Sequence, residues 1–346
     1  MSDALRITRD ADLRARNTFG VAARAPWLFE LSDATRLPEV CALPELRDAP
    51  LLLLGGGSNL LFAGDAPGPV LALTGARIDV VGREADHVVV RADAGVEWHA
   101  LVMHTLELGL SGLENLALIP GSTGASPIQN IGAYGVEVAE RIRVVEAFEP
   151  VTGLIHRLSR DDCAFGYRDS RFKREAGRFI VTAVEFNLST GAAPRLEYAG
   201  LSDELAAIEA PTARDVARAV IAIRRRKLPD PAVLGNAGSF FKNPIVPVAL
   251  ADALAAEHPA LPAFRGADAA SRKLSAAWLI DQTGWKGYRN GDAGVAASHA
   301  LVLVNHGRAS GLELLDLAQR VAASVHARFG VELEPEPRVI GADWAP

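Results

Sequence analysis

Short apolar runs rich in valine and isoleucine alternate along the chain with connections rich in glycine and proline. Such runs are typical of β-strands, and they occur at residues 70–73, 87–90, 143–148 and 180–186. A run of four leucines at 51–54 ends in three glycines, which predicts a buried strand followed by a tight turn.

Helical periodicity is clearest in three segments. Apolar residues from Trp98 to Thr105 fall on one helical face, and the pattern ends near Gly109. Residues 212–227 and 310–329 show the same spacing. We therefore expect mixed α and β structure, with helices between groups of strands.

The charged and imidazole groups on these helices have structural explanations. His99 and His104 lie on the first helix without a second histidine at metal-ligand spacing, so we assign neither a role. The basic run Arg224–Lys227 ends the helix at 212–227, where cations interact favourably with the helix dipole.

Composition excludes several classes of protein. The 346 residues are 49% hydrophobic and 23% charged, which is enough for more than one core. A net charge of -6 argues against a nucleic-acid partner. The two cysteines lack disulfide-framework or zinc spacing, so we expect no metal site.

Targeting signals are not expected either. Residues 1–20 mix Asp and Arg without an apolar segment, which predicts no signal peptide and a cytoplasmic protein. The uncharged stretch at 115–136 is long enough to span a bilayer, but its prolines, amides and glycines predict a loop-rich segment. We therefore expect no membrane partner.

Two glycine-rich segments are candidates for binding a phosphate group. Gly55–Asn59 can bring its backbone close to a diphosphate and offer N–H groups. Its spacing matches neither the GxGxxG nor the Walker pattern, so a plain tight turn is an equal alternative. Residues 116–135 form a long loop of small and amide residues, for which a second diphosphate or sugar site is favoured over a passive loop.

Other segments carry side chains suited to catalysis. The loop at 235–244 brings together Ser239, Lys242 and Asn243, and Arg168 lies in FGYRDS at 165–170. These provide a hydroxyl, an ammonium, a carboxamide and a guanidinium.

Three glutamates near the end of the chain form another candidate group. Glu332, Glu334 and Glu336 alternate with apolar residues and prolines, so they share one face of an extended chain, at an edge strand or a strand end. Neighbouring like charges can raise a carboxyl pKa toward a proton-donating range. A solvated edge is the ordinary explanation, and Glu334 and Glu336 are equivalent candidates by local sequence.

Several motifs together resemble the UDP-N-acetylenolpyruvoylglucosamine reductase family. They are NTFG at 17–20, LGGGSN at 54–59, GLENLALIPGSTGASPIQNIGAYG at 112–135, FGYRDS at 165–170, KLPDP at 227–231, GNAGSFFKNP at 235–244 and LEPEPRVIG at 333–341. They cover nearly the whole chain, and their order makes chance resemblance improbable.

The resemblance implies an α+β fold with a two-part FAD-binding module of the vanillyl-alcohol-oxidase (PCMH) type and a C-terminal α+β substrate-binding domain. It implies a first FAD subdomain at 1–75 plus 331–346, a second at 76–227 and a substrate domain at 228–330. The implied reaction reduces UDP-N-acetylglucosamine enolpyruvate to UDP-N-acetylmuramate with NADPH and non-covalent FAD, in peptidoglycan precursor synthesis. We expect a monomer.

The resemblance also implies roles for individual residues. FAD contacts are expected from Gly55, Gly56, Gly57, Ser58, Asn59, Pro120, Gly121, Ser122, Thr123, Gly124, Ala125, Asn130, Gly132 and Arg338. Substrate contacts are expected from Tyr167, Tyr198, Lys227, Asn243 and Lys286.

The implied catalytic residues are Arg168, Ser239 and Glu336. Hydride addition leaves carbanion character on the substrate α-carbon, which Arg168 and Glu336 would stabilise and Ser239 would protonate, aided by Lys242 or water. Tyr198 resembles the tyrosine loop of the type I form, and His299 stands where some relatives carry glutamine.

Two other functions are compatible with parts of the pattern. A different FAD-linked oxidase or dehydrogenase of the same fold would have no use for Ser239. A non-catalytic flavin-binding or nucleotide-sugar-binding protein would need the glycine loops alone, and Arg168, Ser239 and Glu336 would then have no shared purpose.

Overall fold

The structure is a computed structural model that describes residues 4–47, 50–198, 200–266 and 268–346. The first three residues of the segment examined for a signal peptide lie outside the described residues. The chain divides into two compact units: unit 1 comprises Met1–Ala11, Ala25–Gly56 and Pro67–Arg225, and unit 2 comprises Asp12–Arg24, Gly57–Ala66 and Arg226–Pro346.

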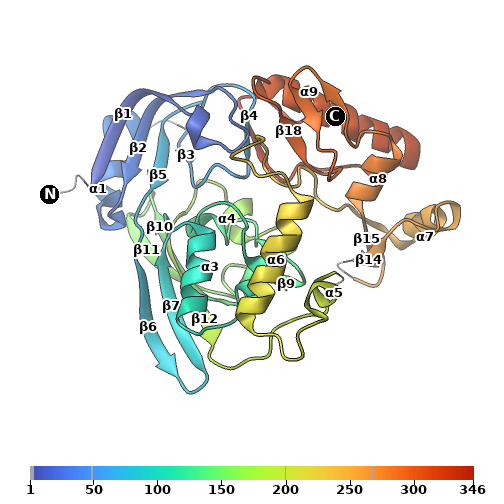
Figure 1. Ribbon diagram of the computed structural model, residues 1–346. Coiled ribbons are helices and arrows are strands. Elements are labelled where there is room, and N and C mark those ends of the chain that lie inside the picture. The colour runs from blue at the N-terminus through green and yellow to red at the C-terminus, as the bar shows by residue number, and fades with distance from the viewer. Residues whose placement is uncertain (1–3, 48–49, 199, 267) are drawn as a thin grey trace. The chain divides into compact units, whose positions relative to one another are not determined.

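A five-stranded antiparallel sheet is the centre of unit 1 (Figure 1). Its strands, in spatial order, are β11 (Leu154–Ser159), β10 (Ile142–Glu149), β12 (Ile180–Ser189), β7 (His87–Asp93) and β6 (Ile78–Glu84). The strands predicted at 87–90, 143–148 and 180–186 are confirmed as β7, β10 and β12. Their alternating valines and isoleucines explain why they pair with one face buried.

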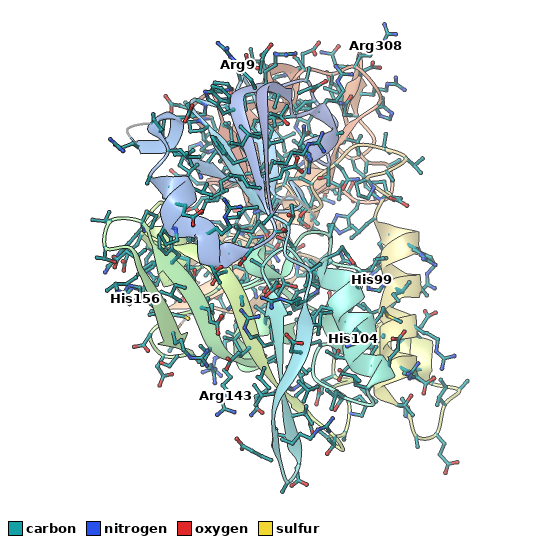
Figure 2. All side chains as sticks on the ribbon, turned by 90° about the vertical axis from the view of Figure 1, so that its left-hand side faces the viewer. Arg9, His99, His104, Arg143, His156 and Arg308 are labelled. Atoms are coloured by element: carbon teal, nitrogen blue, oxygen red, sulfur yellow. The ribbon has the colours of Figure 1, made fainter. Side chains whose placement is uncertain are left out.

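Two helices lie side by side on one face of this sheet, α3 (Trp98–Glu107) and α6 (Ala213–Lys227) (Figures 1 and 2). Both were predicted from their periodicity. Trp98 packs edge-on against Phe186 of β12, with ring centroids 5.9 Å apart, and Val220 of α6 belongs to the same buried cluster. Packing on the sheet therefore buries the apolar face of each helix.

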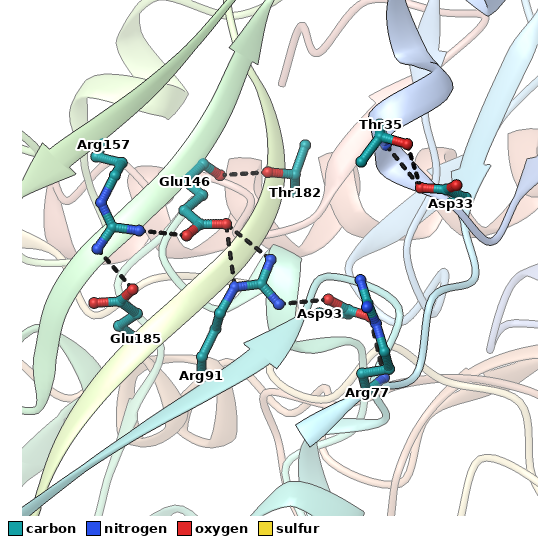
Figure 3. Close-up of polar contacts among 9 residues, drawn as sticks. All are labelled: Asp33, Thr35, Arg77, Arg91, Asp93, Glu146, Arg157, Thr182 and Glu185. Carbon is teal, nitrogen blue, oxygen red and sulfur yellow. Dashed lines mark hydrogen bonds and ion pairs between the residues drawn. The ribbon is translucent and has the colours of Figure 1, made fainter. Parts of the chain in front are cut away.

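The other face of the sheet carries a network of charged side chains (Figure 3). Arg91 pairs with both Asp93 and Glu146 at 2.8 Å. Arg157 then pairs with Glu146 at 2.5 Å and with Glu185 at 2.7 Å. These residues alternate along their strands with buried valines and alanines, as the period of two requires.

A second sheet in unit 1 has four strands in the order β1 (Leu5–Asp12), β2 (Arg24–Leu31), β5 (Val70–Leu73) and β3 (Leu52–Leu53). Strands β2 and β3 both run parallel to β5. The predicted strands at 70–73 and 51–54 are therefore confirmed, and the glycines after β3 form a turn. Short helices complete the unit: α1 (Leu37–Cys41), α2 (Pro44–Arg47), α4 (Arg171–Arg174) and α5 (Leu201–Leu205).

The connection between α3 and β10 is a long loop with little regular structure. It contains single 3-10 turns at Glu114–Leu116 and Thr123–Ala125 and a small hairpin of β8 (Gly132–Ala133) and β9 (Val136–Glu137). This is the glycine-rich segment that the sequence predicts to be a loop.

Unit 2 contains three small sheets. Strand β4 (Leu60–Phe62) pairs in parallel with β19 (Arg338–Ile340), β13 (Ile245–Pro247) and β14 (Ala263–Arg265) flank β15 (Ser271–Leu274), and β17 (Ala293–Val295) lies between β16 (Arg289–Asn290) and β18 (Leu303–Asn305). The helices are α7 (Val248–Glu257), α8 (Ala276–Gln282) and α9 (Gly311–Phe329).

The predicted helix at 310–329 is confirmed as α9, and its ends follow from sequence. Ser310 and Glu313 form a capping box, and Gly330 closes the helix with a φ of 64°. Among the described residues, no helix is long and apolar enough to cross a membrane. Within that same part of the chain, His, Cys, Asp and Glu side chains form no group of three or more that could hold a metal ion.

Candidate active site

In unit 1, the turn after β3 packs closely against the loop at 120–125. A Cβ atom added at Gly56 would lie 2.8 Å from the Cα of Gly121, and one added at Gly55 would lie 2.5 Å from Oγ of Ser122. At Gly56, where the neighbouring atoms are backbone, only glycine allows so close an approach. The arrangement exposes backbone rather than side chains, and it fits a cofactor that carries a diphosphate.

The start of α3 holds the loop at 120–125 in place. The Trp98 amide donates to the Gly121 carbonyl at 3.0 Å, and the Thr123 amide donates to the Val96 carbonyl at 2.8 Å. The Thr123 hydroxyl is buried without a hydrogen-bond partner among the described residues. Because buried polar atoms normally have a partner, this hydroxyl also fits a loop that receives a polar cofactor group.

Asn130 is fully buried, and its carboxamide is occupied by the protein itself. Its Nδ2 donates to Glu137 at 2.8 Å and to the Gly166 carbonyl at 3.0 Å, and its Oδ1 accepts from the Ala139 amide at 3.1 Å. A contact between Asn130 and FAD would therefore use the backbone.

Arg168 is held against the same loop. Its Nη2 donates to the Gly132 carbonyl at 2.7 Å, while its guanidinium lies 5.4 Å from the centroid of the Tyr167 ring. Arg168 and Asn130 both have positive φ, of 51° and 47°. Two strained turns, at 130–134 and 166–169, thus hold each other in place. Asn130 of the first turn donates to the Gly166 carbonyl, and Arg168 of the second donates to the Gly132 carbonyl.

Tyr198, which with Tyr167 is a candidate substrate contact in unit 1, lies against Tyr134. The rings meet edge to face with centroids 5.1 Å apart, and 46% of Tyr198 is exposed. An exposed aromatic ring with a polar hydroxyl is suited to contacting a ligand.

In unit 2, the loop that carries Ser239 pairs with the segment that carries Glu336. The Glu336 amide donates to the Phe240 carbonyl at 2.7 Å, and the Lys242 amide donates to the Glu334 carbonyl at 3.0 Å. On its other side, the Phe240 amide donates to the Leu301 carbonyl at 2.7 Å. Ser239 and Glu336 therefore lie on adjacent segments, although nearly one hundred residues separate them in the chain.

A buried asparagine shapes the turn before Ser239. The Asn236 carboxamide donates to the Pro229 carbonyl at 3.1 Å and to the Leu234 carbonyl at 2.8 Å, and it accepts from the Gly238 amide at 2.9 Å. Gly238 has a φ of 70°, which favours glycine. The family motif GNAGS thus has a structural explanation.

The structure distinguishes Glu334 from Glu336. Glu334 is 72% exposed in its side chain and pairs with Lys242 at 2.7 Å. The chain then bends at Glu336, which is partly buried. Lys242, which was expected to aid Ser239, thus forms an ion pair with Glu334. The predicted alternation of exposed glutamates holds only for Glu332 and Glu334.

The remaining candidate FAD contacts of unit 2 lie around β4 and β19. A Cβ at Gly57 would meet the Arg16 carbonyl oxygen at 2.0 Å, and Gly57 has a φ of 62°. Asn59 donates from Nδ2 to the Glu336 carbonyl at 3.2 Å and accepts from the Arg338 amide at 3.0 Å. Asn59 therefore joins the glycine turn to the Glu336 segment; Ser58 lies between Gly57 and Asn59 in the same turn.

Lys227, Lys286 and His299 share one electrostatic environment in unit 2. Burial, and then the positive charges of Lys227 and Lys286, lower the pKa of the His299 imidazole. Asn243 accepts a hydrogen bond from the Ala276 amide at 3.0 Å, at the start of α8. The two lysines and the neutral histidine suit a site for an anionic group.

The sequence interpretation missed two polar contacts of the glycine-rich loop. His99, which was given no role, accepts a hydrogen bond at Nδ1 from the Leu118 amide at 3.1 Å. Arg224, which was explained by the helix dipole, donates from Nε to the Leu118 carbonyl at 3.2 Å. No local signal identifies these contacts, because their partner is backbone distant in sequence.

A cleft of about 600 Å³ in unit 1 lies apart from these candidates. Glu84, His87, Arg141 and Asn187 are among the residues that line it. His87 is the first residue of β7, whereas Ala94 follows the last residue of that strand. Ala94 is the residue that accepts from the Gly124 amide, at 2.9 Å. None of the candidate site residues lines this cleft.

Comparison with known proteins identifies the family. The FAD binding domain family matches residues 27–159. The family described as UDP-N-acetylenolpyruvoylglucosamine reductase, C-terminal domain, matches residues 230–340. UDP-N-acetylenolpyruvoylglucosamine reductase of Xanthomonas euvesicatoria pv. vesicatoria (strain 85-10) is 56% identical over 350 residues, which cover 99% of this chain and 100% of that protein. The chain belongs to the UDP-N-acetylenolpyruvoylglucosamine reductase family.

Other members of the reductase family agree with this assignment. The protein of Xanthomonas axonopodis pv. citri (strain 306) is also 56% identical, over 99% of this chain and 100% of its own. The crystal structure of UDP-N-acetylenolpyruvylglucosamine reductase from Thermus caldophilus has a TM-score of 0.68 and 27% identity, and the match covers 97% of this chain and 99% of that one.

The fold class predicted from sequence is confirmed by these matches. The chain contains an FAD-binding domain of the PCMH type and the C-terminal domain of the reductase family. The roles of individual residues, the three-part domain division and the type I assignment remain predictions.

Proposed function

We propose that this chain is an FAD-dependent UDP-N-acetylmuramate dehydrogenase, which reduces UDP-N-acetylglucosamine enolpyruvate to UDP-N-acetylmuramate with NADPH in peptidoglycan precursor synthesis. The observation that carries this proposal is the 56% identity to family members over 99% of the chain. The alternative of a different FAD-linked oxidase would not account for the matching C-terminal domain at 230–340.

Two loops would hold the diphosphate of FAD. Gly55–Asn59 would contribute backbone N–H groups. In Pro120–Ala125, Pro120 has no N–H and the amides of Thr123, Gly124 and Ala125 donate within the protein, so this loop would contribute the N–H groups of Gly121 and Ser122 and the Thr123 hydroxyl. The backbone of Asn130 and Gly132 would lie beside them, and Arg338 would contribute its side chain near the flavin. When bound, FAD supplies the hydride that adds to the β-carbon of the enolpyruvyl group. The binding would be non-covalent.

The chain's own residues would stabilise and protonate the reacting substrate. Addition at the β-carbon leaves negative charge on the α-carbon and its carboxylate, and Arg168 would offset this charge electrostatically. Glu336, in its protonated form, would donate a hydrogen bond to the enolate-like oxygens. Ser239 would then donate its hydroxyl proton to the α-carbon and recover a proton from water.

Other residues would bind the remainder of the substrate. Lys227, Lys286 and Asn243 would contact the diphosphate and sugar, and Tyr167 would contact the substrate as well. Tyr198 would close over the bound molecule as in the type I form. The lowered pKa of His299 keeps an uncharged donor beside the two lysines.

The larger organisation follows the same proposal. The FAD subdomains would be 1–75 with 331–346 and 76–227, and the substrate domain would be 228–330. We propose that the protein is cytoplasmic, since its substrate is a nucleotide-linked precursor that would be made in the cytoplasm. We also propose that it is a monomer.

Half-reaction measurements test the proposal. Under anaerobic conditions, NADPH should bleach the flavin absorbance of the wild type, and the enolpyruvyl substrate should restore it with formation of the lactyl ether. Ser239→Ala should keep the first step and lose most of the second. If the wild-type flavin is reduced but the enolpyruvyl substrate does not reoxidise it, the proposed reaction is wrong.

A matched pair of glutamate variants tests the carboxylate assignment. Glu336→Gln should lose reoxidation about as severely as Ser239→Ala, by about 100-fold or more. Glu334→Gln should change the rate little, because it removes only an exposed ion pair with Lys242. The reverse order would transfer the catalytic role to Glu334.

A further inference from the structure

The backbone at Leu118 adopts a conformation that is unusual for its residue type. Leu118 has a φ of 58°, in the left-handed region that a side chain with a Cβ atom disfavours. It is not a glycine, and it lies two residues before Pro120, where the proposed diphosphate loop begins. Such a conformation persists only when surrounding contacts hold it.

Two side chains from different helices hold both polar groups of Leu118. Nδ1 of His99, in the first turn of α3, accepts from the Leu118 amide at 3.1 Å. Nε of Arg224, in the last turn of α6, donates to the Leu118 carbonyl at 3.2 Å. The neighbouring Leu116 carbonyl accepts from the Trp98 indole at 2.9 Å. The chain is thus anchored immediately before the loop.

These anchors continue into the loop itself. The Gly121 carbonyl accepts from the Trp98 amide, and the Thr123 amide donates to the Val96 carbonyl. His99, Trp98 and Val96, at the start of α3 and just before it, therefore make successive hydrogen bonds to residues 118–123. Loss of the bond between His99 and Leu118 would remove the first of these and allow Pro120 and Gly121 to shift.

We propose that His99 and Arg224 are positioning residues that hold the loop at 118–125 in the conformation that binds the diphosphate of FAD. The inference rests on the proposed function, because it assigns FAD to this loop. Neither residue needs to touch the cofactor, since each acts through the Leu118 peptide.

The contact of His99 requires a neutral imidazole. A lone pair at Nδ1 accepts the Leu118 amide, and the protonated ring has none there. Burial lowers the pKa of His99, the nearby Glu97 opposes this shift, and Arg225 and Arg224 add to it. The contact is therefore complete above the ordinary pKa of histidine and is lost as the pH falls through the lowered value.

Two substitutions at His99 separate the acceptor from the titration. His99→Asn places its carboxamide oxygen near the position of Nδ1 and does not titrate, whereas His99→Gln places it near Nε2. His104 lies on the same helix and has no side-chain bond to the loop, so His104→Asn is the matched control (Figure 2). FAD dissociation constants are measured from flavin fluorescence between pH 5.5 and 8, and hydrogen exchange of the Leu118 amide is measured in the protein without FAD.

The expected results are specific to the contact. His99→Gln should weaken FAD binding about tenfold at pH 8 and speed exchange at Leu118, because a partly buried amide loses its acceptor. His99→Asn should bind FAD nearly normally and lose part of the acid dependence of the wild type. Arg224→Met should also weaken binding, and Arg225→Gln should move the acid transition to higher pH, because a positive charge that lowers the pKa of His99 is removed.

Two results would overturn the inference. One is wild-type FAD affinity and Leu118 exchange in folded His99→Gln, and the other is an unchanged acid dependence in His99→Asn. Failure of the proposed function has a different signature. In that case the wild-type protein would not bind FAD, while exchange at Leu118 would still report whether His99 holds the loop.

Discussion

Replacing Gly56 with alanine tests how closely the two cofactor loops of unit 1 must approach. The added Cβ would lie 2.8 Å from the Cα and 3.2 Å from the carbonyl carbon of Gly121. Carbon atoms prefer separations of at least about 3.5 Å, so the loops must move apart by roughly 0.7 Å. Both sides of the contact are backbone, and no side-chain rotation relieves it.

Gly55→Ala is a matched control in the same turn. Its Cβ would lie 2.5 Å from Oγ of Ser122, but the next atoms are at 3.6 Å or more. The serine hydroxyl can rotate away at little cost. The two variants add the same methyl group one residue apart, so a difference between them reports the backbone contact.

The expected cost of the Gly56 substitution is about 1–3 kcal/mol, the usual range for overpacking. If the loops separate, this cost falls on cofactor binding and corresponds to a loss of about 5- to 150-fold in FAD affinity. Fluorescence titration of the protein with FAD measures the affinity, and urea unfolding without FAD measures any loss of stability. Equal FAD affinity and equal stability in the two variants would show that the loops are not in contact as described.

Two further predictions concern buried polar groups of unit 1. Asn130→Asp should lower the free energy of unfolding by about 3 kcal/mol in urea, because the carboxylate cannot donate to Gly166 and repels Glu137. Normal stability would contradict this account. The pKa of Glu149 is lowered chiefly by its hydrogen bond from Arg178, so its stabilisation is present above the ordinary carboxyl range and lost as the pH falls through the lowered pKa. Glu149→Gln should therefore destabilise at pH 7, and the difference should shrink as the pH falls below the ordinary carboxyl range, whereas a pH-independent difference would exclude this origin.

The regular elements of the fold could be predicted because their causes are local. Strand β5 matches the predicted run at 70–73, and α9 begins and ends at a capping box and a glycine that are visible in the sequence. Hydrophobic period and terminal signals act within a few residues. The same local signals predict the glycine turn after β3.

The long loop between α3 and β10 could be predicted to exist, but its conformation could not. Its polar groups are held by His99 and Arg224, which lie on helices far apart in sequence. From sequence, both residues have adequate local explanations, as a helix residue and a helix-terminal cation. Their contacts depend on how the helices pack on the sheet, which local patterns do not specify.

The candidate catalytic residues could be identified by family resemblance and only partly by chemistry. Local sequence treats Glu334 and Glu336 alike. The pairing of segments at 240–242 and 334–336 separates them, since Glu334 is exposed against Lys242 and Glu336 lies at the bend. That pairing depends on chain topology over nearly one hundred residues, which no short motif encodes.

Backbone strain gives independent support for the position of the site in unit 1. Of the six non-glycine residues with positive φ in the described part of the chain, four are Leu118, Asn130, Tyr134 and Arg168. Each costs about 1 kcal/mol or more, and such residues concentrate where function requires a defined backbone. In this loop the strain is held by side chains that point to backbone: Asn130 to Gly166, Arg168 to Gly132, and His99 and Arg224 to Leu118. The mutual contacts of Asn130 and Arg168 mean that neither turn keeps its conformation alone. Arg168 is therefore oriented by the same loop that is proposed to bind the cofactor. Cofactor binding would then be coupled to the orientation of the Arg168 guanidinium.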